Sequence, residues 1–158
     1  MHSLHKIVLI SLSTPTYNNV RAASALPYHL IRAQRGEGTA FVVYSFNINE
    51  IAPDEIKQIE ASLGITIRLL PRPRWMLVMM RLRLLLLRVL LRYPLASYYR
   101  LSSAAIQAVK AENPDVVWIY GEEIAGLARW FSGTRCVVTM PDCESLFYYR
   151  LLGKAFAT

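Results

Sequence analysis

Three short polar segments of this sequence hold side chains that can do acid–base or binding chemistry. They are residues 14–21, 120–123 and 141–145, and each follows an apolar run of strand length. In a parallel sheet, ligands bind beyond the carboxyl ends of the strands, where these segments begin. Asp142 is the best candidate for a catalytic general base, because an acid placed there can face a bound hydroxyl. Glu122 is a candidate for substrate binding. Both acids also suit the first turn of a helix, and that purely structural interpretation stays open.

The first of these segments contains four candidate substrate-binding residues: Tyr17, Asn18, Asn19 and Arg21. It has neither the GxGxxG fingerprint nor the GxxxxGK[ST] phosphate loop, so nothing in it favours a nucleotide. Asn18 and Asn19 tolerate a left-handed backbone and can orient amide groups at the start of a helix, which is an anion site. The simpler interpretation is that one of them caps the helix.

Strand-like runs alternate with helical patterns along the chain. We expect strands at residues 6–12, 39–45, 65–70, 115–120 and 135–140. We expect helices at residues 20–34, 53–63, 75–92, 97–112, 122–131 and 142–152. Strands and helices that alternate with short connections are typical of a parallel sheet covered on both faces. The sequence therefore predicts an α/β fold, a Rossmann-like three-layer sandwich, with residues 1–158 as one domain.

Positive charge is concentrated in one part of the chain. The formal net charge is +7, yet no Asp or Glu occurs between Glu60 and Glu112. Nine Lys and Arg residues lie in that gap, so the remainder of the chain is slightly acidic. The neighbours of these cations are mostly Leu, Met and Val, whereas a nucleic-acid-binding surface has polar or aromatic neighbours. We therefore expect no nucleic-acid partner.

The basic segment is expected to form an amphipathic helix at about 74–92. At about 100° per residue, four arginines fall in a narrow stripe: Arg74, Arg81, Arg88 and Arg92. The rest of the helix is apolar nearly all round, but it is too short and too charged to span a bilayer. A helix lying in the membrane interface, with arginine near lipid phosphates, fits both features. The alternative is a helix packed between the sheet and another domain or subunit.

Other kinds of site are excluded by the composition. The two cysteines form no CxxC motif, and the three histidines show no ligand spacing, so we expect no metal, no cofactor and no disulfide scaffold. Cys136 and Cys143 are expected to pack rather than react. The apolar run near Met1 is too short for a signal peptide or a bilayer span. We therefore expect a cytoplasmic protein, peripheral at the inner face of the plasma membrane.

Taken in order, three stretches resemble the N-terminal domain of family 4 glycosyltransferases, the retaining GT-B enzymes that use nucleotide-sugar donors. Residues 6–21 stand where that family has its first strand, turn and first helix. Residues 113–120 are similar to its PDVV strand, and residues 137–150 look like its VVT and HD strand and following helix. The resemblance covers nearly the whole chain and rests on the order and spacing of these motifs.

Two local departures from the family are clear. Asn18 and Asn19 stand where the family's first turn is usually rich in glycine, and Pro141 replaces its common His, so that only Asp142 matches. GT-B enzymes also pair two Rossmann-like domains, and nothing in this chain corresponds to the second, donor-binding one. We therefore expect these residues alone to be inactive in sugar transfer.

The resemblance implies the acceptor-side domain of a membrane-associated hexosyltransferase in bacterial envelope or exopolysaccharide biosynthesis. Its partners would be a nucleotide-sugar donor held mainly by the second domain, a lipid-linked or saccharide acceptor, and an anionic membrane surface. The alternative is a non-catalytic subunit that recruits a separate donor-binding protein to the membrane. Only the first interpretation needs Asp142.

Overall fold

The computed structural model describes residues 5–17, 22–34, 38–73 and 98–139. The predicted basic helix at 74–92 and the predicted last helix at 142–152 lie outside the described residues. Asn18, Asn19, Arg21 and Asp142 lie outside them as well.

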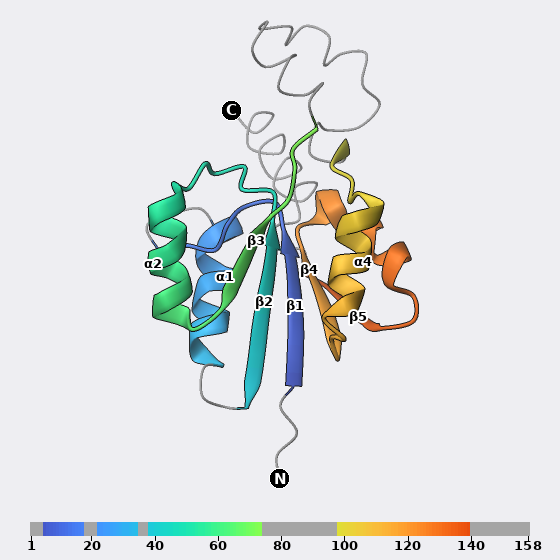
Figure 1. Cartoon of the computed structure of the whole chain (residues 1–158), viewed down its shortest axis with the longest axis horizontal. Coiled ribbons are helices and arrows are strands. Elements are labelled where there is room, and N and C mark those ends of the chain that lie inside the picture. The colour runs from blue at the N-terminus through green and yellow to red at the C-terminus, as the bar shows by residue number, and fades with distance from the viewer. Residues whose placement is uncertain (1–4, 18–21, 35–37, 74–97, 140–158) are drawn as a thin grey trace, which may run out of the picture.

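Five parallel strands form one sheet at the centre of the described chain (Figure 1). They are β1 (His5–Ser11), β2 (Thr39–Ser45), β3 (Thr66–Leu69), β4 (Val116–Tyr120) and β5 (Arg135–Thr139). Their order is β3-β2-β1-β4-β5, and every neighbouring pair is parallel. The prediction of a parallel α/β sheet is thus confirmed, and the strand at 39–45 has the predicted bounds.

Helices cover both faces of this sheet. They are α1 (Ala22–Ala33), α2 (Pro53–Leu63), α4 (Ser103–Ala111) and η3 (Glu122–Phe131), the last a 3₁₀ helix. α1 and α2 lie on one face, and α4 and η3 on the other (Figure 1). This is the predicted Rossmann-like three-layer sandwich. No helix in the described ranges is long and apolar enough to cross a membrane.

The bounds of α2 follow directly from its sequence. Pro53 occupies the first turn, where its missing N–H costs nothing, and Asp54 and Glu55 follow where the helix dipole favours acids. Ile59 and its neighbours on the same face are buried against the sheet. Gly64 ends the helix with a left-handed φ of 66° and donates its N–H to the Glu60 carbonyl.

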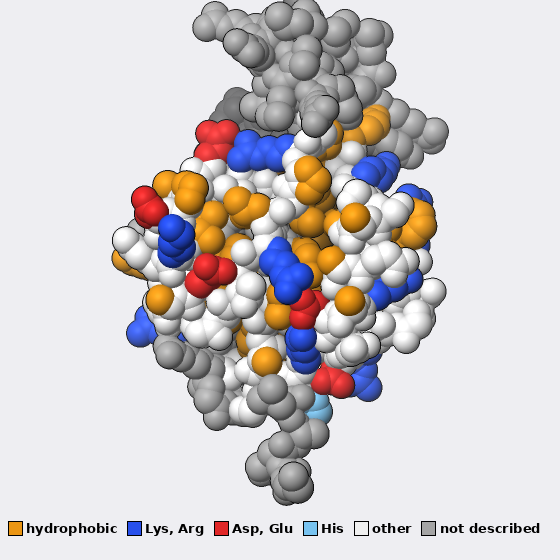
Figure 2. Space-filling view, in the orientation of Figure 1, with side chains coloured by type: hydrophobic (Ala, Val, Ile, Leu, Met, Phe, Trp, Pro, Cys, Tyr) orange, Lys and Arg blue, Asp and Glu red, His pale blue; other side chains and the backbone are white. Residues whose placement is uncertain are grey.

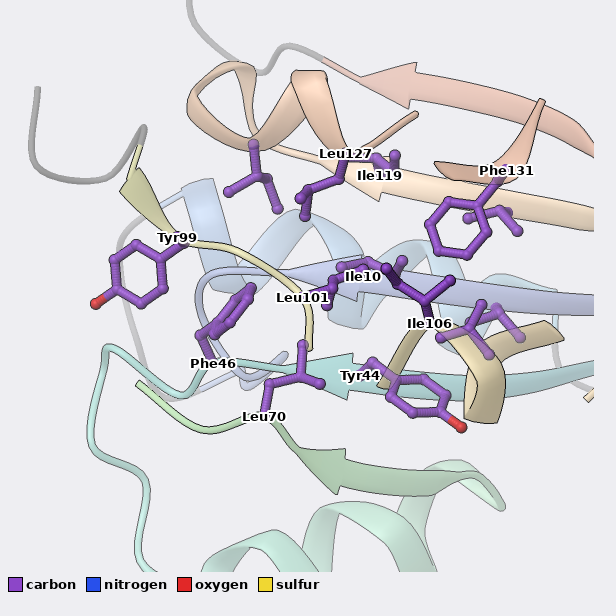
Figure 3. Packing of buried hydrophobic residues seen from close by; sticks show 14 of the residues in the cluster. Ile10, Tyr44, Phe46, Leu70, Tyr99, Leu101, Ile106, Ile119, Leu127 and Phe131 are labelled. Atoms are coloured by element: carbon purple, nitrogen blue, oxygen red, sulfur yellow. The ribbon is translucent and has the colours of Figure 1, made fainter. Parts of the chain in front are cut away.

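The helix predicted at 97–112 begins later than expected, at Ser103. Ser102 has extended backbone and its hydroxyl accepts a hydrogen bond from the N–H of Ala105 at 3.1 Å, so it is the N-cap. Before that cap, Tyr99 and Leu101 are buried in the core (Figure 3). Alternate side chains of an extended segment point to the same side, so Tyr99 and Leu101 can both enter the core. This packing outweighs the helical pattern that the sequence has at 97–102.

Each sheet face has its own hydrophobic core, because successive strand side chains point to opposite faces. Val117 and Ile119 of β4 pack with α4 and η3, and Trp118 and Tyr120 pack on the side of α1 and α2. Figure 3 shows part of the first core, where Phe131 and Leu127 of η3 approach the strands. The strands are therefore continuous apolar runs in the sequence, because both faces of the sheet are buried.

A cluster of charged side chains fastens the end of α4 to the sheet. Glu112 accepts hydrogen bonds from the Lys6 ammonium at 2.5 Å and lies 2.7 Å from the Arg68 guanidinium. Arg68 also donates to the Tyr44 hydroxyl at 3.2 Å. The hydrogen bond from Lys6, with the charge of Arg68, holds the pKa of Glu112 below its usual range, although burial acts in the opposite direction. Figure 2 shows acidic and basic side chains intermingled on this face.

We predict that Glu112→Gln lowers the free energy of unfolding by about 2 kcal/mol at pH 7, since it removes a charge that accepts two strong hydrogen bonds. Because the folded-state pKa of Glu112 is lowered, its contribution is present above the unfolded pKa of about 4.3 and disappears as the pH falls through the folded value. Urea unfolding of both proteins between pH 3 and pH 7 should therefore show a difference that shrinks below roughly pH 4.5. Asp54→Asn, at a 92% exposed side chain, is the control and should lower the free energy of unfolding by less than about 1 kcal/mol, the contribution of an exposed charge at a helix start.

Candidate functional site

The carboxyl ends of the strands meet at one edge of the sheet, and the strand order reverses between β1 and β4. β1 pairs with β2 on one side and with β4 on the other. The connection after β1 runs toward β2, whereas that after β4 runs toward β5, so the two turns diverge. Such a divergence opens the crevice where ligands bind in this class of sheet. Ser11 and Tyr120 are register partners at this point.

Buried hydroxyl groups and half-buried amide groups join the turn after β1 to the turn after β2. The Thr14 N–H donates to Asn49 Oδ1 at 2.8 Å, and Asn49 Nδ2 donates to the Thr14 carbonyl at 2.9 Å. The Thr14 hydroxyl donates to Asn47 Oδ1 and lies 3.0 Å from Ser45 Oγ. Since Thr14 has one hydroxyl proton, Ser45 is the donor to Thr14. The two turns are therefore held as one unit.

Asn47 is the centre of this unit. Its backbone is left-handed, with φ of 50°, which Asn tolerates better than most residues. Its side chain accepts from the Ile51 N–H and donates to the Ile51 carbonyl, both at 3.0 Å. Its own carbonyl accepts a hydrogen bond from Arg72. Sequence reasoning missed Asn47 and Asn49, although their polar run directly follows the strand at 39–45, at the same edge as Thr14.

The first turn has an additional anchor on α1. The Thr16 N–H donates to the carbonyl of Ser24 at 3.2 Å, and both Thr16 and Ser24 are buried. The turn after β1 is therefore docked on the first turn of α1.

Tyr17, a predicted substrate-binding residue, stands at the surface at the end of this anchored turn. Its side chain is 62% exposed, and its ring lies 5.6 Å from that of Tyr28, which is itself buried. An exposed aromatic ring supported by a buried one is a suitable platform for a ligand. The structure thus places Tyr17 at the edge where the sequence predicted it.

Glu122, the other described candidate, begins η3 directly after β4. Gly121 precedes it with φ of 123°, a conformation that only glycine adopts easily, and a Cβ there would lie 3.2 Å from Glu123 Oε2. The Gly121 N–H donates to the Thr139 carbonyl at 3.0 Å, which joins the ends of β4 and β5. Tyr17 and Glu122 therefore share the carboxyl edge, on the turns after neighbouring strands.

An open pocket of about 450 Å³ lies at the same edge, between η3 and the segment that precedes α4. Its lining includes two arginines, Arg100 and Arg129, together with Glu123. The sequence analysis assigned no role to these residues. The signal that could have identified them is the position of Glu123 and Arg129 beyond the end of a strand, on a helix with a buried apolar face.

Metal and thiol chemistry find no support in the described part of the chain. No group of three or more His, Cys, Asp or Glu side chains there could hold a metal ion. Cys136 packs against the core beside η3, as predicted, and burial raises the pKa of its thiol. A raised pKa disfavours the thiolate, which is the reactive form.

We predict that Thr14→Val lowers the free energy of unfolding by about 1–3 kcal/mol. The change leaves the buried Ser45 hydroxyl without its acceptor, and it removes the hydroxyl that donates a hydrogen bond to Asn47 Oδ1. Thr66→Val, the same chemical change at an exposed strand residue, should stay within about 0.5 kcal/mol of the wild type. Denaturant unfolding measures both. Equal midpoints for the two variants would mean that the network does not hold the turns together.

Comparisons with known proteins identify no relative of this chain. No family model matches the chain, and searches of curated proteins and of solved structures found no match. The fold and the geometry of the carboxyl edge are therefore the basis for assigning a function.

Proposed function

We propose that this chain is the acceptor-side domain of a retaining GT-B glycosyltransferase. In such an enzyme a sugar passes from a nucleotide-sugar donor to a hydroxyl of a lipid-linked or saccharide acceptor, in bacterial envelope or exopolysaccharide biosynthesis. The observation that carries the proposal is the carboxyl edge between β1 and β4, where Tyr17 and Glu122 stand on neighbouring turns. The order and spacing of the family-like motifs support it.

The chemistry available at this edge suits a hydroxylated acceptor. A carboxylate such as Glu122 accepts hydrogen bonds from sugar hydroxyls, and the exposed ring of Tyr17 offers an apolar face to a sugar ring. Positioning of this kind supplies a large part of the rate enhancement in group transfer, provided that the positioning residues are rigid. The hydrogen-bonded unit around Thr14 and Asn47 gives the Tyr17 turn that rigidity.

Asp142 is proposed as the general base of this site. It follows Thr139, the last residue of β5, by three positions in the sequence. The Thr139 carbonyl is bonded to Gly121, immediately before Glu122. The assignment of Asp142 therefore rests on its place in the sequence, shortly after the last strand.

The basic segment at 74–92 is proposed to hold this edge at an anionic membrane. β3 ends at Leu69 at the carboxyl edge, and α4 is preceded at the same edge by Tyr99, so the segment leaves and rejoins the described chain beside the site. A membrane contact there would bring a lipid-linked acceptor to the site. The peripheral location at the inner face of the plasma membrane belongs to this proposal.

We predict that Asp142→Ala in the intact enzyme lowers sugar transfer by about 10²–10⁴-fold, the usual contribution of a general base. The assay follows radiolabel from a panel of nucleotide sugars into lipid and polysaccharide fractions of membranes that contain the protein. Asp54→Ala, at a 92% exposed carboxylate on α2, is the control and should retain full activity. Residues 1–158 alone should give no transfer.

Unchanged transfer by the Asp142→Ala variant would refute the general-base assignment and favour the non-catalytic recruitment subunit. Robust transfer by residues 1–158 without any partner would contradict the acceptor-domain assignment itself.

A second prediction concerns the membrane. Replacing Arg81, Arg88 and Arg92 with Gln should weaken binding to phosphatidylglycerol vesicles by about a hundredfold, at about 1 kcal/mol for each arginine. Replacing the exposed Arg32, Lys57 and Arg135 with Gln removes the same charge elsewhere and should weaken binding much less. Vesicle sedimentation measures both. If the unaltered chain sediments equally with and without anionic vesicles, the membrane role is wrong.

A further inference from the structure

The pocket between η3 and the start of the α4 segment is separate from the turn that carries Tyr17. Its walls come from two stretches that are far apart in sequence: Tyr99 and Arg100 on one side, and residues 123–129 of η3 on the other. Figure 3 shows Tyr99 and Leu127 on these two neighbouring segments. The volume of about 450 Å³ lies within the range of about 300–1,000 Å³ that small-molecule sites occupy.

The polar part of this pocket combines two guanidinium groups with one carboxylate. Arg100 donates to the Tyr99 carbonyl at 3.0 Å, and the Arg129 guanidinium lies 5.0 Å from the centre of the Trp130 ring. Each arginine thus has a neighbouring contact, and both side chains line the pocket. Arg100 and Arg129 are exposed, and Glu123 is half-buried.

The floor of the pocket is apolar and rigid. Tyr99, Ile124 and Leu127 are each buried within the core on this face of the sheet. The pocket therefore offers a fixed surface below and charged groups around it. A carboxylate and two guanidinium groups together satisfy a ligand that has both hydroxyl donors and a compact anion.

We propose that this pocket binds a small phosphorylated, hydroxyl-rich molecule, with a sugar phosphate as the chemical class. Arg100 and Arg129 hold the phosphate oxygens, since the planar guanidinium fork matches phosphate geometry. Glu123 accepts hydrogen bonds from the hydroxyls, and the floor of Tyr99, Ile124 and Leu127 contacts the carbon skeleton. The proposal depends on the pocket alone and holds whether or not the chain takes part in sugar transfer.

Gly126 provides a specific way to close the pocket. Gly126 lines the cavity, and its φ is not left-handed. A Cβ added to it would have no neighbouring heavy atom within 4 Å. Gly126→Leu therefore places a side chain at the pocket without backbone strain. Gly133 has the same open space but is not among the pocket residues, so Gly133→Leu is the matched control.

The test is isothermal titration of the full chain with three probes: glucose 1-phosphate, inorganic phosphate and glucose. We expect glucose 1-phosphate to bind at least about tenfold more tightly than either other probe, because only it engages both the arginines and Glu123. Arg129→Gln and Gly126→Leu should each weaken this binding by about tenfold or more. Gly133→Leu should leave it unchanged, and thermal melts verify that all three variants fold.

Three results would overturn the proposal. They are no heat of binding with glucose 1-phosphate, equal affinity for inorganic phosphate, and unchanged affinity in both Arg129→Gln and Gly126→Leu. None of these depends on the transfer assay of Asp142→Ala, so a failure of the pocket and a failure of the proposed enzyme activity are distinguishable.

Discussion

Backbone groups at the end of a buried parallel strand must find hydrogen-bond partners, and this requirement shapes the whole carboxyl edge. In this chain, hydrogen bonds between the turn after β1 and the turn after β2 meet this requirement. The N–H groups of Phe46 and Ile48 donate to carbonyls of Ser11 and Leu12, and the Thr14 backbone exchanges hydrogen bonds with the Asn49 amide. The turns after β1 and β2 are therefore parts of one rigid unit, on which any ligand chemistry near Tyr17 depends.

The carboxyl edge has two parts of different chemical character. On the side of β1 and β2, buried hydroxyls and half-buried amides dominate, and they position the backbone. On the side of η3, exposed charges line an open pocket. The adjacent residues Glu122 and Glu123 belong to different sites, one to the turn after β4 and the other to the pocket. Gly121 fixes the backbone at the start of η3, immediately before these two residues, in a conformation special to glycine.

The sequence was most informative where local and global preferences agree. The strand at 39–45 and the helix at 53–63 have apolar patterns and end signals that match their burial, so their bounds were predicted correctly. The stretch at 97–102 has a helical pattern, yet the core needs Tyr99 and Leu101 there, and only tertiary packing reveals that. The pocket was missed for a similar reason, because Arg100 and Arg129 come together only through the fold. Tyr17 and Glu122 were predicted to follow strand ends, and they do, because strand ends can be recognised from a single sequence.

The position of β1 in the middle of the sheet has a consequence for the chain as it is synthesised. β1 is translated before its partners, and its β4 side, where the Lys6 N–H meets Asp115, joins residues 109 positions apart. During that interval one hydrogen-bonding edge of β1 has no native strand to pair with, and Val8 and Ile10 lack the α4 and η3 residues that cover them. Pairings across such sequence distances form slowly. The nascent chain therefore keeps one edge of this apolar strand unpaired until residues 116–120 have been synthesised.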